Sequence, residues 1–183
     1  MKVLLMRGIS CSGKSTFVSG LKGNKIVCSA DDYHVQDGKY NFRQENAQAA
    51  HRDCFLRFLR VVSTPTDRYS DEDFLIVDNT NTTVLELAPY VRLAETFGFS
   101  LTIVRLYVPF EIACQRNNGH HVPSDVIWRQ YQNILTERLP SYWRETILCP
   151  EDDGLDVVPS DEQIDTDVLL QASERLTKTL REM

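Results

Sequence analysis

The sequence predicts an α/β fold in which a central, mostly parallel sheet of about five strands carries helices on both faces. Three observations support this prediction. Apolar runs of strand length, such as residues 74–77, are continuous rather than alternating, which is typical of strands buried on both faces. Segments with apolar residues at helical spacing lie between these runs. The first run leads directly into a glycine-rich loop of the kind that joins a strand to a helix in parallel sheets.

The predicted elements alternate along the chain as this fold requires. The expected strands are residues 2–7, 25–29, 74–77 and 101–107, with a last strand or edge near 147–148. The expected helices are residues 15–21, 44–62, 84–97, 110–116, 124–135 and 164–180. Thr83 and Glu86 form a capping box for the third of these helices, and Pro89 either kinks it or marks its first turn. Residues 150–160 are acidic and contain prolines, which predicts a linker-like loop.

Length and composition indicate a single domain over residues 1–183. A chain of 183 residues buries enough surface to fold without covalent cross-links. Its five cysteines include no CxxC pair, so we expect reduced thiols in a cytoplasmic protein rather than disulfides or a zinc site. No segment resembles a signal peptide or a membrane span. The sequence does not indicate the oligomeric state.

The net charge of −6 argues against a surface that is basic overall, as proteins that grip many phosphates usually have. The acidic charge favours a small molecule over a polynucleotide as the partner on which the protein acts. Much of the acidity lies in the C-terminal third, however, so the N-terminal part can still hold a basic groove. Its candidate residues, which are otherwise solvated charges on a helix surface, are Arg43, Arg52, Arg57, Arg60 and Arg68.

The strongest motif follows the first strand and is a Walker A loop. Its glycines allow successive backbone N–H groups to turn inward and cradle phosphates at a helix N-terminus. Lys14 is expected to reach the β- and γ-phosphates, and the Ser15 hydroxyl to bind Mg²⁺. We therefore predict a site for ATP and Mg²⁺ whose nucleotide-binding residues are Gly8, Ser10, Cys11, Ser12, Gly13, Lys14, Ser15 and Thr16.

Acidic residues follow two further strands, at the sheet edge where open α/β sheets bind ligands. After residues 25–29 come Asp31 and Asp32, then Tyr33 and His34. We expect Asp31 to face the γ-phosphate and Asp32 to cap the next turn; the alternative is that both aspartates only cap a helix or turn. Asp78 follows residues 74–77 and either holds a Mg²⁺-bound water or the loop lysine, in the manner of a Walker B aspartate, or ties its own loop by hydrogen bonds.

Two shorter segments complete the predicted site. Asp37 begins a turn before a short extended piece with two aromatic residues, 39–42, which we expect to be an ordered surface loop. Residues 116–123 are polar, contain a glycine and lie between two helices, which predicts a mobile lid. Arg116, at the base of the lid, is expected to supply positive charge to the transferring phosphoryl group.

The ordered set of four motifs resembles the polynucleotide-kinase-like P-loop kinases. These motifs are the Walker A loop, the tips at 31–33 and 78–81, and the lid that begins at Arg116, and the resemblance covers roughly residues 2–140. It implies a P-loop kinase fold with a small helical lid and a 5′-hydroxyl kinase activity. It also implies that Asp31 is the general base, and that Lys14, Ser15 and Arg116 serve the phosphates and metal.

The resemblance further implies a nucleic acid, DNA or RNA, as the acceptor, held by Asp31, Asp32, Tyr33 and His34. Two departures bear on this expectation. His34 stands where phage-type members have an arginine that contacts the acceptor's 3′-phosphate, and residues 119–121 replace a lid with a second arginine. A hydroxymethylated base in DNA, a nucleoside or another small molecule therefore remains an alternative acceptor, and a non-catalytic nucleotide-binding module is the competing class of function.

Overall fold

The computed structural model describes residues 1–65, 68–117, 121–149 and 158–159. Its main sheet has the strand order β2-β5-β1-β6-β7-β8. The first five strands in this order are parallel, and β8 pairs with β7 in the antiparallel sense. Their bounds are β1 Lys2–Arg7, β2 Lys25–Cys28, β5 Phe74–Val77, β6 Ser100–Leu106, β7 Glu145–Leu148 and β8 Val158–Pro159. The strand before the Walker A loop is central, as the predicted fold requires.

The helices alternate with these strands. Their bounds are α1 Lys14–Gly20, α2 Ala47–Val62, α3 Val84–Thr96, α4 Phe110–Gln115 and α5 Ser124–Thr136. Two 3₁₀ helices, η1 Ala30–His34 and η2 Gln44–Asn46, flank a two-stranded hairpin of β3 Val35–Gln36 and β4 Lys39–Tyr40. Positive φ angles at Asp37 and Gly38 form the hairpin turn that the sequence predicted.

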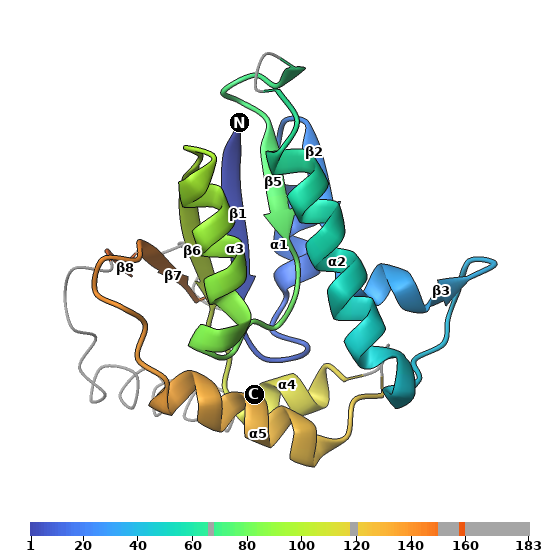
Figure 1. Ribbon diagram of the computed structural model, residues 1–183. Coiled ribbons are helices and arrows are strands. Elements are labelled where there is room, and N and C mark those ends of the chain that lie inside the picture. The colour runs from blue at the N-terminus through green and yellow to red at the C-terminus, as the bar shows by residue number, and fades with distance from the viewer. Residues whose placement is uncertain (66–67, 118–120, 150–157, 160–183) are drawn as a thin grey trace.

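Side-chain alternation along the strands divides the core between the two sheet faces. Leu5 and Val77 pack with α2 and α3 on one face, whereas Met6 and Ile76 pack with Val18 of α1 on the other. In Figure 1 α2 and α3 lie in front of the sheet, and α4 and α5 cross its lower end, where the strands end. Helices therefore cover both faces, and the predicted α/β architecture is confirmed.

A buried ionic cluster lies on the α3 side of the sheet. Arg7 Nη1 donates to Glu145 Oε1 at 2.9 Å, and Arg105 Nε lies 3.6 Å from the same oxygen. Arg7 also donates to the carbonyl oxygens of Thr82 and Glu137. Burial lowers the pKa of Arg105, although Glu145 opposes the shift. One carboxylate thus holds two neighbouring strands' arginines, and its loss would leave two buried charges of the same sign.

Several expectations for individual elements need correction. Helix α3 begins at Val84 with the predicted capping box, so Pro89 lies inside it rather than at its first turn. Helix α5 begins at Ser124 as expected and extends one residue beyond its predicted end, to Thr136. The predicted loop at 150–160 contains β8, and its other residues lie outside the described part, as does the predicted helix 164–180. Within the described residues, no helix is long and apolar enough to span a bilayer.

Candidate active site

The candidate site lies where three neighbouring strands end. The Walker A loop connects β1 to α1, η1 follows β2, and Asp78 follows β5. Because β2, β5 and β1 are adjacent and parallel, their carboxyl ends meet at one edge of the sheet. The order of the strands therefore brings together segments that are up to about seventy residues apart in sequence.

The Walker A loop has the curled backbone that exposes N–H groups to an anion. Cys11 and Gly13 have φ angles of 64° and 92°, a region in which glycine is unstrained and other residues are uncommon. At Gly8 the constraint is space, because a Cβ atom there would lie 2.7 Å from the Leu106 carbonyl oxygen and from Ser12 Oγ. The loop is thus pressed against β6, and only glycine fits at its first position.

Lys14 lies inside the loop rather than in solvent. Its ammonium group donates to the carbonyl oxygens of Ile9 at 2.8 Å and Gly8 at 3.1 Å. Burial lowers the pKa of Lys14 to about 8, and the negative charge of Asp78 is the largest influence in the opposite direction. The lysine is therefore a desolvated cation that an anionic ligand in the loop would strongly favour.

Ser15 and Asp78 form the pair that the sequence suggested for a metal ion. Ser15 Oγ donates to Asp78 Oδ2 at 2.8 Å, while Asp78 Oδ1 is buried without a hydrogen-bond partner among the described residues. Burial raises the pKa of Asp78, against the opposing effects of Ser15 and Lys14. A carboxylate and a hydroxyl oxygen are the hard ligands that Mg²⁺ takes alongside water and phosphate oxygens, so these residues fit that ion.

The segment after Asp78 is hydrogen-bonded both to η1 and to the start of the Walker A loop. Asn79 Oδ1 accepts from the backbone of Ala30 at 2.9 Å, and the Thr80 carbonyl oxygen accepts from Gly8 N at 2.9 Å. Asn81 donates to the Met6 carbonyl oxygen at 2.8 Å. The end of β5 is therefore bonded to the start of η1 and to both sides of the β1 terminus.

The two adjacent aspartates of η1 have different partners. Asp31 Oδ1 accepts from the Tyr40 hydroxyl at 3.1 Å. Asp32 Oδ2 accepts from Arg57 Nη1 of α2 at 2.8 Å, and the same guanidinium bonds to Asp53 and to the Ser29 carbonyl oxygen. Asp32 thus anchors η1 to α2, whereas Asp31, exposed like its neighbour, lies close enough to Lys14 to raise the pKa of the lysine.

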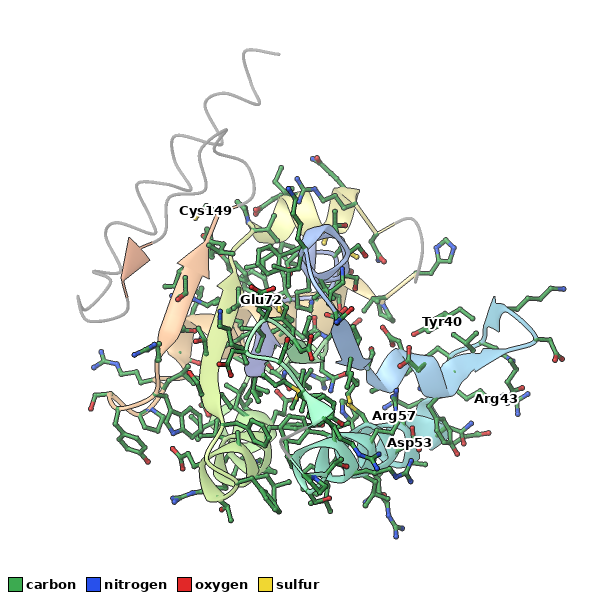
Figure 2. The ribbon with its side chains drawn as sticks, turned by 90° about the horizontal axis from the view of Figure 1, so that it is seen from above. Tyr40, Arg43, Asp53, Arg57, Glu72 and Cys149 are labelled. Carbon is green, nitrogen blue, oxygen red and sulfur yellow. The ribbon has the colours of Figure 1, made fainter. Side chains whose placement is uncertain are left out.

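The hairpin between η1 and η2 carries a cluster of aromatic rings. We call residues 33–42 the arm, and Figure 2 shows its Tyr40 and the neighbouring Arg43 to one side of the sheet, with Arg57 and Asp53 beside its base. His34 is buried, and its ring centroid lies 4.9 Å from that of Phe42. The ring of His34 is therefore part of the arm's interior.

The base of the predicted lid and α5 both contact the Walker A loop. Arg116 is the exposed residue at the end of α4, and residues 118–120 of the predicted lid lie outside the described part. Asn117 bonds to both the N–H and the carbonyl oxygen of Val122 and accepts weakly from Cys11 Sγ at 3.7 Å. Gln130 of α5 accepts from Ser10 N at 2.8 Å.

Comparison with known proteins places these features in a family. The sequence profile of AAA_33, described as an AAA domain, matches residues 3–137. The chain belongs to this AAA domain family. It is also 26% identical over 164 residues to human NEDD4-binding protein 2, a match that covers 80% of this chain but only 9% of the length of that protein.

Solved structures share the fold of this AAA domain. The AvrRxo1-ORF1:-ORF2 structure with ATP matches at a TM-score of 0.66 and 13% identity, covering 93% of this chain and 62% of that chain. A sugar kinase from Janibacter sp. matches at a TM-score of 0.50 and 18% identity, covering 81% and 85%. At these identities the likeness concerns the fold, which is that of a P-loop kinase.

The structure brings several of the residues that the sequence predicted for the site close together, but not all of them. The structure brings Lys14, Ser15, Asp31 and Asp78 to one sheet edge, while Arg116 lies at the lid base and the exposed Tyr33 on the arm. Sequence reasoning named Arg57 only as a candidate for a basic groove, and it did not single out Tyr40 or Gln130. For Arg57 the available signal was Asp53 four residues earlier, which forms an ion pair with it at 3.0 Å.

Proposed function

We propose that this AAA domain is an ATP-dependent kinase that transfers the γ-phosphate to the 5′-hydroxyl of a polynucleotide. The observation that carries the proposal is the exposed Asp31 carboxylate, held by Tyr40 at the sheet edge that also presents Lys14 and the Ser15–Asp78 pair. The likeness to a structure that contains ATP supports the choice of nucleotide. The polynucleotide acceptor rests on the resemblance of the four motifs to polynucleotide-kinase-like enzymes.

The proposed reaction gives each residue a distinct task. The acceptor oxygen attacks the γ-phosphorus, the bond to the β-phosphate oxygen breaks, and the acceptor proton passes to Asp31 as ADP leaves. Lys14 and Arg116 stabilise the charge on the phosphoryl oxygens, and the Tyr40 hydroxyl fixes the orientation of the Asp31 carboxylate. Mg²⁺, held by Ser15 and Asp78, would neutralise charge on the phosphates. Asp32 is a positioning residue, since Arg57 already binds it.

Phosphate transfer from labelled ATP to a panel of acceptors tests the proposal. The panel contains 5′-hydroxyl DNA and RNA oligonucleotides, duplexes with a hydroxymethylated base, nucleosides and sugar acids. We expect transfer to the oligonucleotides, abolished by Lys14→Ala. Transfer confined to nucleosides, modified bases or sugar acids would contradict the polynucleotide acceptor, and ATP binding without transfer to any hydroxyl would instead support a non-catalytic nucleotide-binding module.

A further inference from the structure

The arm exposes an unusual amount of aromatic surface for its size. Tyr33, Tyr40 and Phe42 are 42%, 36% and 50% exposed, although the two strands of the arm contain only two residues each. Large apolar side chains left in water at one place mark an interaction site more often than isolated ones do. The exposed rings therefore make the arm a candidate interaction surface.

The rings are held in a fixed arrangement. The ring of His34 lies 5.9 Å from Tyr33 and 6.1 Å from Tyr40 by centroid, both edge-to-face, and 4.9 Å from Phe42. A backbone hydrogen bond of 2.8 Å from Asn41 N to the His34 carbonyl oxygen closes the arm next to Phe42. The buried histidine thus acts as a central support for rings that remain partly exposed.

The ring cluster is directly connected to the proposed general base. The same Tyr40 whose ring contacts His34 donates its hydroxyl to Asp31 at 3.1 Å. Asp31 is also only two residues before Tyr33 in η1. A molecule that presents its hydroxyl to Asp31 would therefore place a neighbouring group against the rings.

We propose that the arm is a stacking platform for the nucleobase of the acceptor's 5′-terminal nucleotide, with Phe42 as its principal contact. This inference rests on the proposed function and names the contact that selects a nucleic acid. Every nucleobase has an apolar face that stacks on an aromatic ring, so the platform accepts all four bases. Arg43, at the end of the arm, is 61% exposed and its ion pair with Glu45 is long, at 3.9 Å, which leaves it available for the acceptor's backbone phosphate.

The size of the arm favours a base over a protein partner. A stable protein interface typically covers about 800 Å² on each side. A few rings on a hairpin with two residues in each strand supply less than that. A base, by contrast, needs only one or two rings, and stacking of one base strengthens binding by roughly one to two orders of magnitude. A site for the acceptor's base must also lie close to Asp31, as the arm does. A protein-docking surface has no such requirement.

A cycle of two changes tests the stacking contact. One change is Phe42→Ala, and the other is an oligonucleotide whose 5′-terminal nucleotide lacks its base but retains the 5′-hydroxyl. For wild-type protein we expect removal of the base to raise the acceptor KM about tenfold, which corresponds to one stacked base. For Phe42→Ala, the KM for the ordinary oligonucleotide should already be raised, and removal of the base should change it less than twofold. Phe42→Trp should restore the discrimination.

Controls separate this inference from a general loss of structure. Phe97→Ala removes an aromatic ring of similar exposure, 42%, at the far end of α3 and should retain the full effect of the missing base. If wild type and Phe42→Ala lose equal affinity when the base is removed, the platform is wrong although the kinase is right. If wild-type protein transfers phosphate to no oligonucleotide, the proposed function fails and this inference fails with it.

Discussion

The buried ammonium group of Lys14 should make ATP binding depend on pH in an unusual range. In the free protein the pKa of Lys14 is about 8, lowered from 10.5 by burial. ATP phosphates in the loop favour the charged lysine and return its pKa to a value above the assay range. Binding therefore takes up a proton when the pH exceeds about 8, and affinity falls as the pH rises. Phosphate groups are already fully ionised there, because their second pKa is about 6.

The magnitude follows from the fraction of Lys14 that is charged before ATP binds. With the pKa at about 8, that fraction is about one half at pH 8 and about 3% at pH 9.5, so the Kd for ATP should rise about 15-fold between them. Titration calorimetry in two buffers of different ionisation enthalpy measures the Kd and the proton uptake together. The uptake at pH 9 should approach one proton per ATP.

Lys14→Arg is the matched control, because arginine keeps its charge throughout this range. The variant retains Asp78 and the neighbouring Cys11, whose pKa burial raises above its ordinary 9.0, so any effect of these groups persists in it. Its affinity for ATP should vary less than threefold from pH 8 to 9.5. Equal Kd values for the wild type at pH 8 and 9.5, with no proton uptake, would refute the assignment of a depressed lysine pKa.

Three further predictions concern catalysis and stability. Asp31→Asn should lower kcat roughly 10²- to 10⁴-fold with little change in the KM for ATP, and a normal kcat in steady-state assays would show that Asp31 is not the base. Gly8→Ala should abolish ATP binding in calorimetry, since its methyl group would lie 2.7 Å from the Leu106 carbonyl oxygen, and tight binding would show that the loop can shift. Glu145→Ala should reduce the free energy of unfolding in urea by about 3–5 kcal/mol, because it leaves two buried arginines unpaired, whereas a loss below about 1 kcal/mol would mean that the cluster is hydrated.

The sequence predicted those parts of the fold that depend on local pattern. Phe74–Val77 was located to the residue because a fully apolar run of four between polar neighbours has no other good interpretation. Strand β7 was only half recognised, since it begins with Glu145, whose charge is explained by an arginine 138 residues earlier in the chain. A strand that carries a polar residue inward to meet a distant partner shows no continuous apolar run.

In the candidate site, too, the sequence predicted what lies within one local motif and not the contacts between distant segments. The Walker A loop is recognisable because one short segment contains the glycines, the lysine and the hydroxyl that the phosphates require. Helical periodicity assigned Arg57 to a polar face but could not show that Asp32 lies across from it. The assignment of Asp31 as the base, and of Arg116 to the phosphates, stays a prediction until the variants are measured.

The hydrogen bonds made by Asn79, Thr80 and Asn81 have a consequence for how such a domain can diversify. This short segment fastens the phosphate cradle and the start of η1 together, so neither can be replaced by a foreign sequence without rebuilding the other. The arm lies outside this fastening and reaches Asp31 through one tyrosine hydroxyl. New acceptor preferences can therefore arise by exchanging the arm alone. A chimaera that carries a different hairpin at residues 33–42 should retain its affinity for ATP.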